Sequence, residues 1–195
     1  PPRAYHIGND AGSLEGSPLH SPESIMSQIT EFYKGTGKDA EGRSLEDIWA
    51  FSDDEMEFHH DFIQWMFPLE TPSRFNRNAP VLTETDIRAF HDDATLRENL
   101  RKSLDRFLAF LGLGREGDRI APAADFPAKR AIFMEPDHNW LRITRTLTCL
   151  RTLGLADEAE RFHEGLERLI LSGNARVTAE TRAFWKNAAF PDRNP

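Results

Sequence analysis

Apolar residues recur at helical spacing along most of this chain and nowhere alternate strictly with polar residues. The segment 92–111 shows the pattern clearly, because successive apolar side chains stand three or four residues apart: Leu96, Leu100, Leu104, Phe107 and Leu111. Such spacing places them on one face of a helix, whereas a half-buried strand needs a period of two. The sequence therefore predicts an all-α fold, and 195 residues suffice for a single compact domain.

Capping residues, prolines and glycines divide the chain into helical segments of unequal length. Ser52 and Glu55, for example, have the spacing of a capping box. We expect about seven to eight helices, at 21–33, 44–49, 53–67, 83–90, 92–111, 137–153, 156–171 and 178–189. Helices so unequal do not build a regular four-helix bundle.

The other segments lack helical spacing. Residues 1–20 are rich in Gly, Ser and Pro and are expected to form an irregular arm, followed by a helical domain at 21–190 and a tail at 191–195. Ser21 is the expected N-cap of the first helix. The proline-containing segment 115–136 is expected to be a long connection with one short element near 131–134, and no strand is expected.

Composition narrows the class of partner. A net charge of −8 and a pI of about 5.4 disfavour nucleic acid, because phosphate binding needs a basic surface. The single cysteine, Cys149, excludes an internal disulfide and fits a reducing compartment. The chain has no apolar run of roughly 18 residues and no signal-peptide pattern. We therefore expect a soluble cytoplasmic protein without a transmembrane segment.

The helix expected at 137–153 carries polar residues on a second face. Its core stripe consists of Trp140, Ile143, Leu147 and Leu150. The opposite face holds a column bordered by Leu141 and Leu153, namely His138, Arg142, Arg145 and Cys149. Leucines and a cysteine are unusual on a solvated face, so both sides should be covered. The arginines then need acidic partners or an anionic ligand; internal salt bridges are the favoured interpretation, and an anion site is the alternative.

The helix expected at 53–67 has two apolar stripes separated by a polar strip. The strip contains Glu57, Asp61 and Gln64, with His60 at its edge. A helix that is apolar on two faces lies centrally, so its polar groups should be hydrogen-bonded. We favour a structural network in which Asp61 or Glu57 orients His60 over a catalytic role.

The spacing Glu-x-x-His occurs three times, at Glu57–His60, Glu135–His138 and Glu160–His163. Di-iron carboxylate bundles use two such pairs together with further glutamates. Pro136 interrupts the second pair, so an alternative metal site would use Glu57, His60, Glu160 and His163. We expect neither a metal nor a cofactor.

Five aromatic-rich strings follow one another in order: SLEDIWAFSDDEME (44–57), HHDFIQWMFP (59–68), FNRNAPVLT (75–83), SLDRFLAFLGL (103–113) and HNWLRITRTLTCLRTLGL (138–155). Together they resemble the conserved N-terminal region of the opioid growth factor receptor family, over about residues 32–171. The resemblance implies an enkephalin-binding, growth-regulating receptor with nuclear or nuclear-envelope association in animals. Because the long C-terminal tail of the vertebrate receptors is not found here, we expect the stand-alone form of the domain.

Three functions remain open. The first is a ligand-binding module that holds a peptide (enkephalin-like by the resemblance) or a small anionic molecule between the helices at 53–67 and 137–153. Its candidate ligand-binding residues are His60, Gln64, Trp65, His138, Asn139, Arg142 and Arg145. In such a module, Arg142 and Arg145 would bind a carboxylate or phosphate, and Trp65 and Trp140 would form walls of the pocket.

The second is an enzyme whose general base is His60 or His138, oriented by Asp61 or Glu57, with catalytic candidates His60, Asp61 and His138. In the third, the polar motifs are buried networks and the domain regulates a protein partner through its surface. We expect a binding or interaction module rather than an enzyme.

Overall fold

The computed structural model describes residues 26–74 and 76–191. The arm expected at 1–20, the N-cap expected at Ser21 and nearly all of the tail lie outside the described residues. The helices and strands are α1 (Gln28–Tyr33), α2 (Leu45–Trp49), α3 (Asp53–Phe58), α4 (Phe62–Met66), α5 (Glu84–Asp92), α6 (Ala94–Phe110), β1 (Leu113–Glu116), β2 (Arg119–Pro122), α7 (Phe126–Lys129), the 3-10 helix η1 (Arg130–Phe133), α8 (Asn139–Thr152), α9 (Ala156–Leu171) and α10 (Ala179–Ala189). The all-α class is confirmed.

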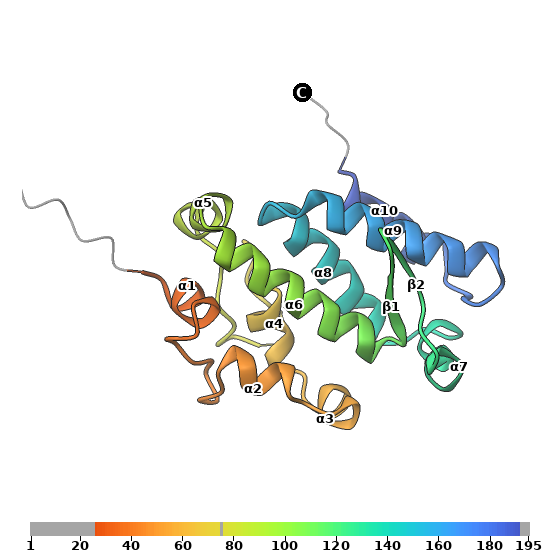
Figure 1. Cartoon of the computed structure of the whole chain (residues 1–195), viewed down its shortest axis with the longest axis horizontal. Helices are drawn as coiled ribbons and strands as arrows, with labels where there is room; N and C mark the ends of the chain where they lie inside the picture. The colour runs from red at the N-terminus through yellow and green to blue at the C-terminus, as the bar shows by residue number, and fades with distance from the viewer. Residues whose placement is uncertain (1–25, 75, 192–195) are drawn as a thin grey trace, which may run out of the picture.

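The longest helix, α6, runs through the middle of the fold. Figure 1 shows it with α1 to α4 on one side and α8 to α10 on the other. Its expected apolar row is buried, with Leu96, Leu100, Leu104 and Phe107 fully covered. On the far side, the indole Nε1 of Trp185 in α10 donates to the Trp140 carbonyl of α8 at 3.1 Å. None of the helices among the described residues is long and apolar enough to cross a membrane.

Three short helices of the first half begin where their capping residues predict, whereas the N-cap of α1 is Ser27 and not Ser21. Ser44, Ser52 and Thr83 each form a complete capping box, at the starts of α2, α3 and α5. Each box satisfies main-chain N–H groups that the first turn of a helix leaves without partners. Local sequence is therefore enough to set these three starts.

The expectation of one continuous helix at 53–67 is wrong, because the chain leaves the helical conformation between α3 and α4. His59 is extended, with φ −82° and ψ 132°. The guanidinium of Arg142 donates to the carbonyls of Met56 and His59, at 2.8 and 2.9 Å. Carbonyl groups at a helix end need partners, and a side chain from α8 supplies them here. No glycine or proline marks the break, so the local sequence does not show it.

The expectation of no strand is also wrong. β1 and β2 form an antiparallel hairpin in which Leu113 pairs with Pro122 and Glu116 with Arg119. Gly117 in the turn has φ +58°, a left-handed conformation that glycine adopts without a steric penalty. Each strand buries only one side chain, Leu113 or Ile120, so no alternating pattern appears in the sequence.

The expected count of helices is too low. The described residues form ten α-helices and one 3-10 helix. The division of 53–67 adds one helix, and the supposed connection at 115–136 contains most of the hairpin together with α7 and η1. The element expected near 131–134 corresponds to η1.

Candidate functional site

A pocket of about 440 Å³ lies between α8 and the segment that runs from the α3–α4 break into the loop after α4. We call it the Arg145 pocket. It is lined by His60, Ile63, Gln64, Leu69, Ser73, His138, Leu141, Arg142, Thr144, Arg145 and Thr148. It joins the two segments that the sequence singles out, 53–67 and 137–153, which are far apart along the chain.

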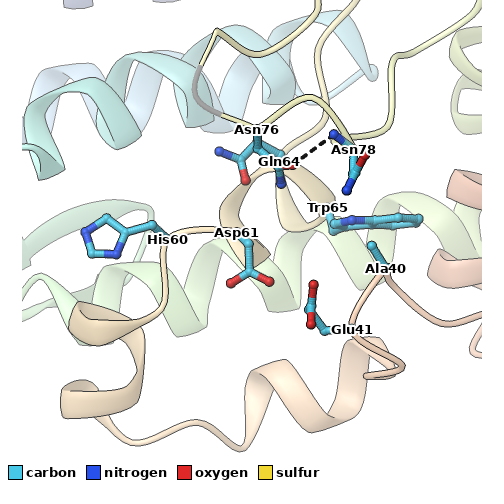
Figure 2. Close-up of a pocket in the computed structure, with 8 residues that line it drawn as sticks. All are labelled: Ala40, Glu41, His60, Asp61, Gln64, Trp65, Asn76 and Asn78. Atoms are coloured by element: carbon cyan, nitrogen blue, oxygen red, sulfur yellow. Dashed lines mark hydrogen bonds between the residues drawn. The ribbon is translucent and has the colours of Figure 1, made fainter.

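Five of the seven expected ligand-binding residues line this pocket: His60, Gln64, His138, Arg142 and Arg145. Asn139 is buried instead and donates from Nδ2 to Oε2 of Glu57 at 3.2 Å. Trp65 lines a smaller neighbouring cavity that shares His60 and Gln64 with the Arg145 pocket (Figure 2). Trp140 does not wall the pocket, since its indole Nε1 donates to the carbonyl of Ile132 at 2.8 Å in the core.

Arg142 is a buried link between α8 and the end of α3. Besides the carbonyls of Met56 and His59, its guanidinium donates to Oδ1 of Asn139 at 3.1 Å and lies over the ring of Phe62. Burial lowers the pKa of Arg142, while the charges of Glu57 and Asp137 raise it. The interpretation of internal salt bridges is wrong for this residue, because its hydrogen-bond partners are main-chain carbonyls and an amide.

Arg145, one turn further along α8, keeps unused donors at the pocket wall. It is half-buried, and its one hydrogen bond among the described residues is from Nη1 to the carbonyl of Phe67, at 3.0 Å. In the part of the chain that the structure describes, no carboxylate lies within ion-pair distance of it. Burial raises the pKa of the neighbouring Cys149 thiol, so that group supplies no negative charge at neutral pH. The burial of Arg145 lowers the pKa of its own guanidinium.

His60 and His138 meet at the pocket, with their ring centroids 5.1 Å apart. His138 lies between two carboxylates, with Nε2 3.5 Å from Oε1 of Glu57 and Nδ1 3.5 Å from Oδ1 of Asp137. His60 instead has its Nδ1 2.9 Å from the carbonyl of Phe58.

Asp61 forms an ion pair with Arg43 rather than with a histidine. The expected orientation of His60 by Asp61 or Glu57 is therefore not found among the described residues. Of the two histidines considered as a general base, His138 is the one that lies beside Glu57.

Sequence reasoning missed the apolar half of the pocket lining. Ile63 and Leu69 contribute part of it, and Leu141 extends into it with 63% of its surface exposed. The position of Leu141 could have been predicted from the sequence, because a leucine at the border of a polar column indicates a face that is neither core nor fully solvated. The position of Leu69 could not have been predicted, since its loop is held by a β-bridge to Val81 that the local sequence does not indicate.

The alternative metal site is not assembled. Glu57 and His60 are separated by the end of α3, so they do not share a helix face. Glu160 is exposed on α9, whereas His163 is buried beside Glu167 and Phe190. The described residues hold no group of three or more His, Cys, Asp or Glu side chains that could bind a metal ion.

The sequence of this chain matches a known protein family. Residues 27–186 match the family described as "Opioid growth factor receptor (OGFr) conserved region". The chain belongs to the opioid growth factor receptor family. Every residue that lines the Arg145 pocket falls inside the matched region.

Three curated relatives in the opioid growth factor receptor family each cover two thirds or more of the chain. The opioid growth factor receptor of Mus musculus is 34% identical over 136 residues, which is 67% of this chain and 21% of the relative. That of Rattus norvegicus is 35% identical over 137 residues, 67% of this chain and 23% of the relative. Opioid growth factor receptor-like protein 1 of Xenopus tropicalis is 29% identical over 155 residues, 77% of this chain and 29% of the relative.

This chain therefore spans less than a third of the length of these three opioid growth factor receptor family relatives. No solved structure matches it. Sequence similarity therefore establishes the family, and the structure described above gives the geometry of the Arg145 pocket.

Proposed function

We propose that this domain binds a ligand that carries an apolar group beside an anionic group, and that the ligand occupies the Arg145 pocket. One observation carries the proposal. The guanidinium of Arg145 lines an open pocket with donors to spare and without a carboxylate partner among the described residues.

A half-buried cation without a counter-charge is unfavourable, because burial removes hydration that no ion pair replaces. A guanidinium presents about five N–H donors in a planar fork suited to carboxylate or phosphate oxygens. His60 lies at the same wall, and its Nε2 has no hydrogen-bond partner among the described residues. An anionic group of a ligand would restore the missing counter-charge.

Another part of the lining is apolar. Ile63, Leu69 and the exposed Leu141 form a surface that water solvates poorly, and small-ligand sites commonly combine such a surface with a few polar groups. An apolar side chain next to a carboxylate is the chemistry of a peptide end or of a small branched acid. The relatives are named as receptors, which favours a peptide.

The test is an NMR titration of the isotopically labelled domain with 4-methylpentanoate and with its neutral amide, 4-methylpentanamide. The two probes share an apolar group and differ in charge. The wild-type domain should bind the carboxylate more tightly. Arg145→Met should weaken carboxylate binding by roughly tenfold or more, since a hydrogen bond to a charged group contributes about 1.5–3 kcal/mol. Binding of the amide should change little.

Arg151→Met is the matched control, because Arg151 is exposed on the same helix and does not line the pocket. It should leave both affinities unchanged. Equal affinity of wild type and Arg145→Met for the carboxylate, or no binding of the carboxylate at all, would contradict the proposed function.

A further inference from the structure

The cavity beside Trp65 is the feature that the proposed function leaves unexplained. It measures about 190 Å³ and is lined by Ala40, Glu41, His60, Asp61, Gln64, Trp65, Asn76 and Asn78. A single buried water needs only roughly 10–15 Å³, so the Trp65 cavity has room for a larger group. His60 and Gln64 line both the Trp65 cavity and the Arg145 pocket, so the two are neighbours.

Trp65 offers a donor to this cavity. Its side chain is 95% covered, being 5% exposed, and packs against Phe32 with ring centroids 5.3 Å apart. Among the described residues its indole N–H has no hydrogen-bond partner. The indole N–H groups of Trp49, Trp140 and Trp185 each have a partner here, whereas that of Trp65 lies at the wall of the cavity. An acceptor on a ligand would supply the missing partner.

Glu41 offers an acceptor to the same cavity. Figure 2 shows its carboxylate and that of Asp61 on one side of the indole, and the amides of Gln64 and Asn76 on the other. Asp61 is already paired with Arg43, whereas the Glu41 carboxylate has no partner among the described residues. The main chain at Glu41 is held in place, because its N–H donates to Oδ1 of Asp39 at 2.9 Å.

The donor at Trp65 favours a group that also carries an acceptor over a simple cation. Arg43 contacts both Asp39 and Asp61, so it neutralises part of the negative charge around the cavity. Trp65 and Glu41 contribute a donor and an acceptor to the lining, beside the side-chain amides of Gln64, Asn76 and Asn78. An amide group has the complementary pair, a carbonyl that accepts from the indole and an N–H that donates to the carboxylate.

We infer that the Trp65 cavity is a second subsite, which holds an amide group of the ligand whose apolar and anionic parts occupy the Arg145 pocket. This inference rests on the proposed function. It narrows the ligand class to an acid that bears at least one amide beyond its apolar group, as a short peptide does.

The test adds one probe to the NMR titration above. N-acetylglycyl-leucine carries the same branched side chain and carboxylate as 4-methylpentanoate, together with two amide groups. The wild-type domain should bind it roughly fivefold to tenfold more tightly, the gain expected from about one net hydrogen bond. Trp65→Phe keeps a ring and removes the N–H. It should abolish this gain and leave the affinity for 4-methylpentanoate unchanged.

Glu41→Ala tests the acceptor at an exposed position, where loss of the side chain leaves the main-chain hydrogen bond to Asp39 in place. It should reduce the gain as well, even if Trp65→Phe folds poorly. Glu180→Ala, an exposed change on α10 far from the cavity lining, is the control and should have no effect.

The possible failures are distinguishable. If N-acetylglycyl-leucine binds no more tightly than 4-methylpentanoate, or if both subsite variants keep the gain, the subsite is wrong while the proposed function stands. If a probe with lysine in place of glycine binds more tightly than its norleucine counterpart, and Glu41→Ala removes the difference, the cavity takes a cation and the amide assignment is overturned. Absence of binding by both acids contradicts the proposed function itself.

Discussion

At the scale of single residues, two arginines one turn apart on α8 have different environments. Arg142 is 5% exposed and bound to main-chain carbonyls, whereas Arg145 is half-buried with most of its donors unused. Helical spacing places both on one face and predicts the same partners for both. What separates them is the end of α3, which lies against Arg142 only. We therefore assign Arg142 to stability and propose Arg145 for ligand binding.

Replacement of Arg142 should destabilise the domain. Arg142→Met leaves the carbonyls of Met56 and His59 without their partner at a buried position, which should lower the free energy of unfolding by about 2–4 kcal/mol. Arg142→Lys should recover only part of this loss, because one ammonium does not reproduce the planar fork. Urea denaturation followed by circular dichroism measures both.

The control for Arg142 is again Arg151→Met, an exposed change that should stay within about 0.5 kcal/mol of wild type. Arg145→Met should also fold, because no buried carboxylate loses a partner. If Arg142→Met proved as stable as wild type, the assignment of Arg142 to the α3–α4 break would fail.

At the scale of elements, local signals predict the starts of helices better than their interruptions. Capping boxes at Ser44, Ser52 and Thr83 place three helix starts from sequence. The break after α3 and the β1–β2 hairpin were missed. Both depend on contacts with distant segments, Arg142 of α8 in the first case and α9 in the second.

The hairpin packs against α9 through a glycine. A Cβ added at Gly165 would lie 2.9 Å from the carbonyl oxygen of Ile120, and that oxygen also accepts from Nη2 of Arg168 at 3.1 Å. In an exposed helix Gly→Ala stabilises by up to about 1 kcal/mol. Here the clash with a held main chain should outweigh that gain, so Gly165→Ala should lower the free energy of unfolding by about 1–3 kcal/mol.

Gly114→Ala is the matched control for the hairpin. The nearest atom to a Cβ at Gly114 is the Cβ of Ala123 at 3.8 Å, an ordinary contact, so this variant should be close to wild type in thermal denaturation. A Gly165→Ala variant more stable than the wild type would mean that α9 and β2 can separate without cost, contrary to the packing described here.

At the scale of the whole molecule, the protonation of one buried histidine should make the free energy of unfolding depend on pH. His163 of α9 is 8% exposed, and its Nε2 has no hydrogen-bond partner among the described residues. Burial lowers the pKa of His163, and Arg182 and Lys186 act in the same direction, while Glu167 and Glu164 raise it. The folded state therefore binds a proton less readily than the unfolded state does.

The contribution of His163 to the free energy of unfolding should accordingly fall as pH drops below about 6.5, the usual pKa of an unfolded histidine, and level off below the folded pKa. His163→Gln should make the loss between pH 7.5 and pH 5.5 smaller, as measured by urea denaturation at both values. His60→Gln, at an exposed histidine, is the control and should keep the wild-type loss. An unchanged loss in His163→Gln would show that other groups cause it.

The sequence by itself determines the helical class, most helix positions and the residues of α8 that face away from its core stripe. These follow from local physics, because helical periodicity and capping depend on residues within a few positions of one another. It also carries enough ordered motifs to indicate the family.

Only the tertiary structure decides which polar residues meet. It divides 53–67 at the contact with Arg142, separates Glu57–His60 from Glu160–His163, and pairs Asp61 with Arg43. It also brings Leu69 and Leu141 to the wall beside Arg145. These outcomes depend on which distant segments supply partners for buried charges and carbonyl groups, and residue spacing along the chain does not contain that information.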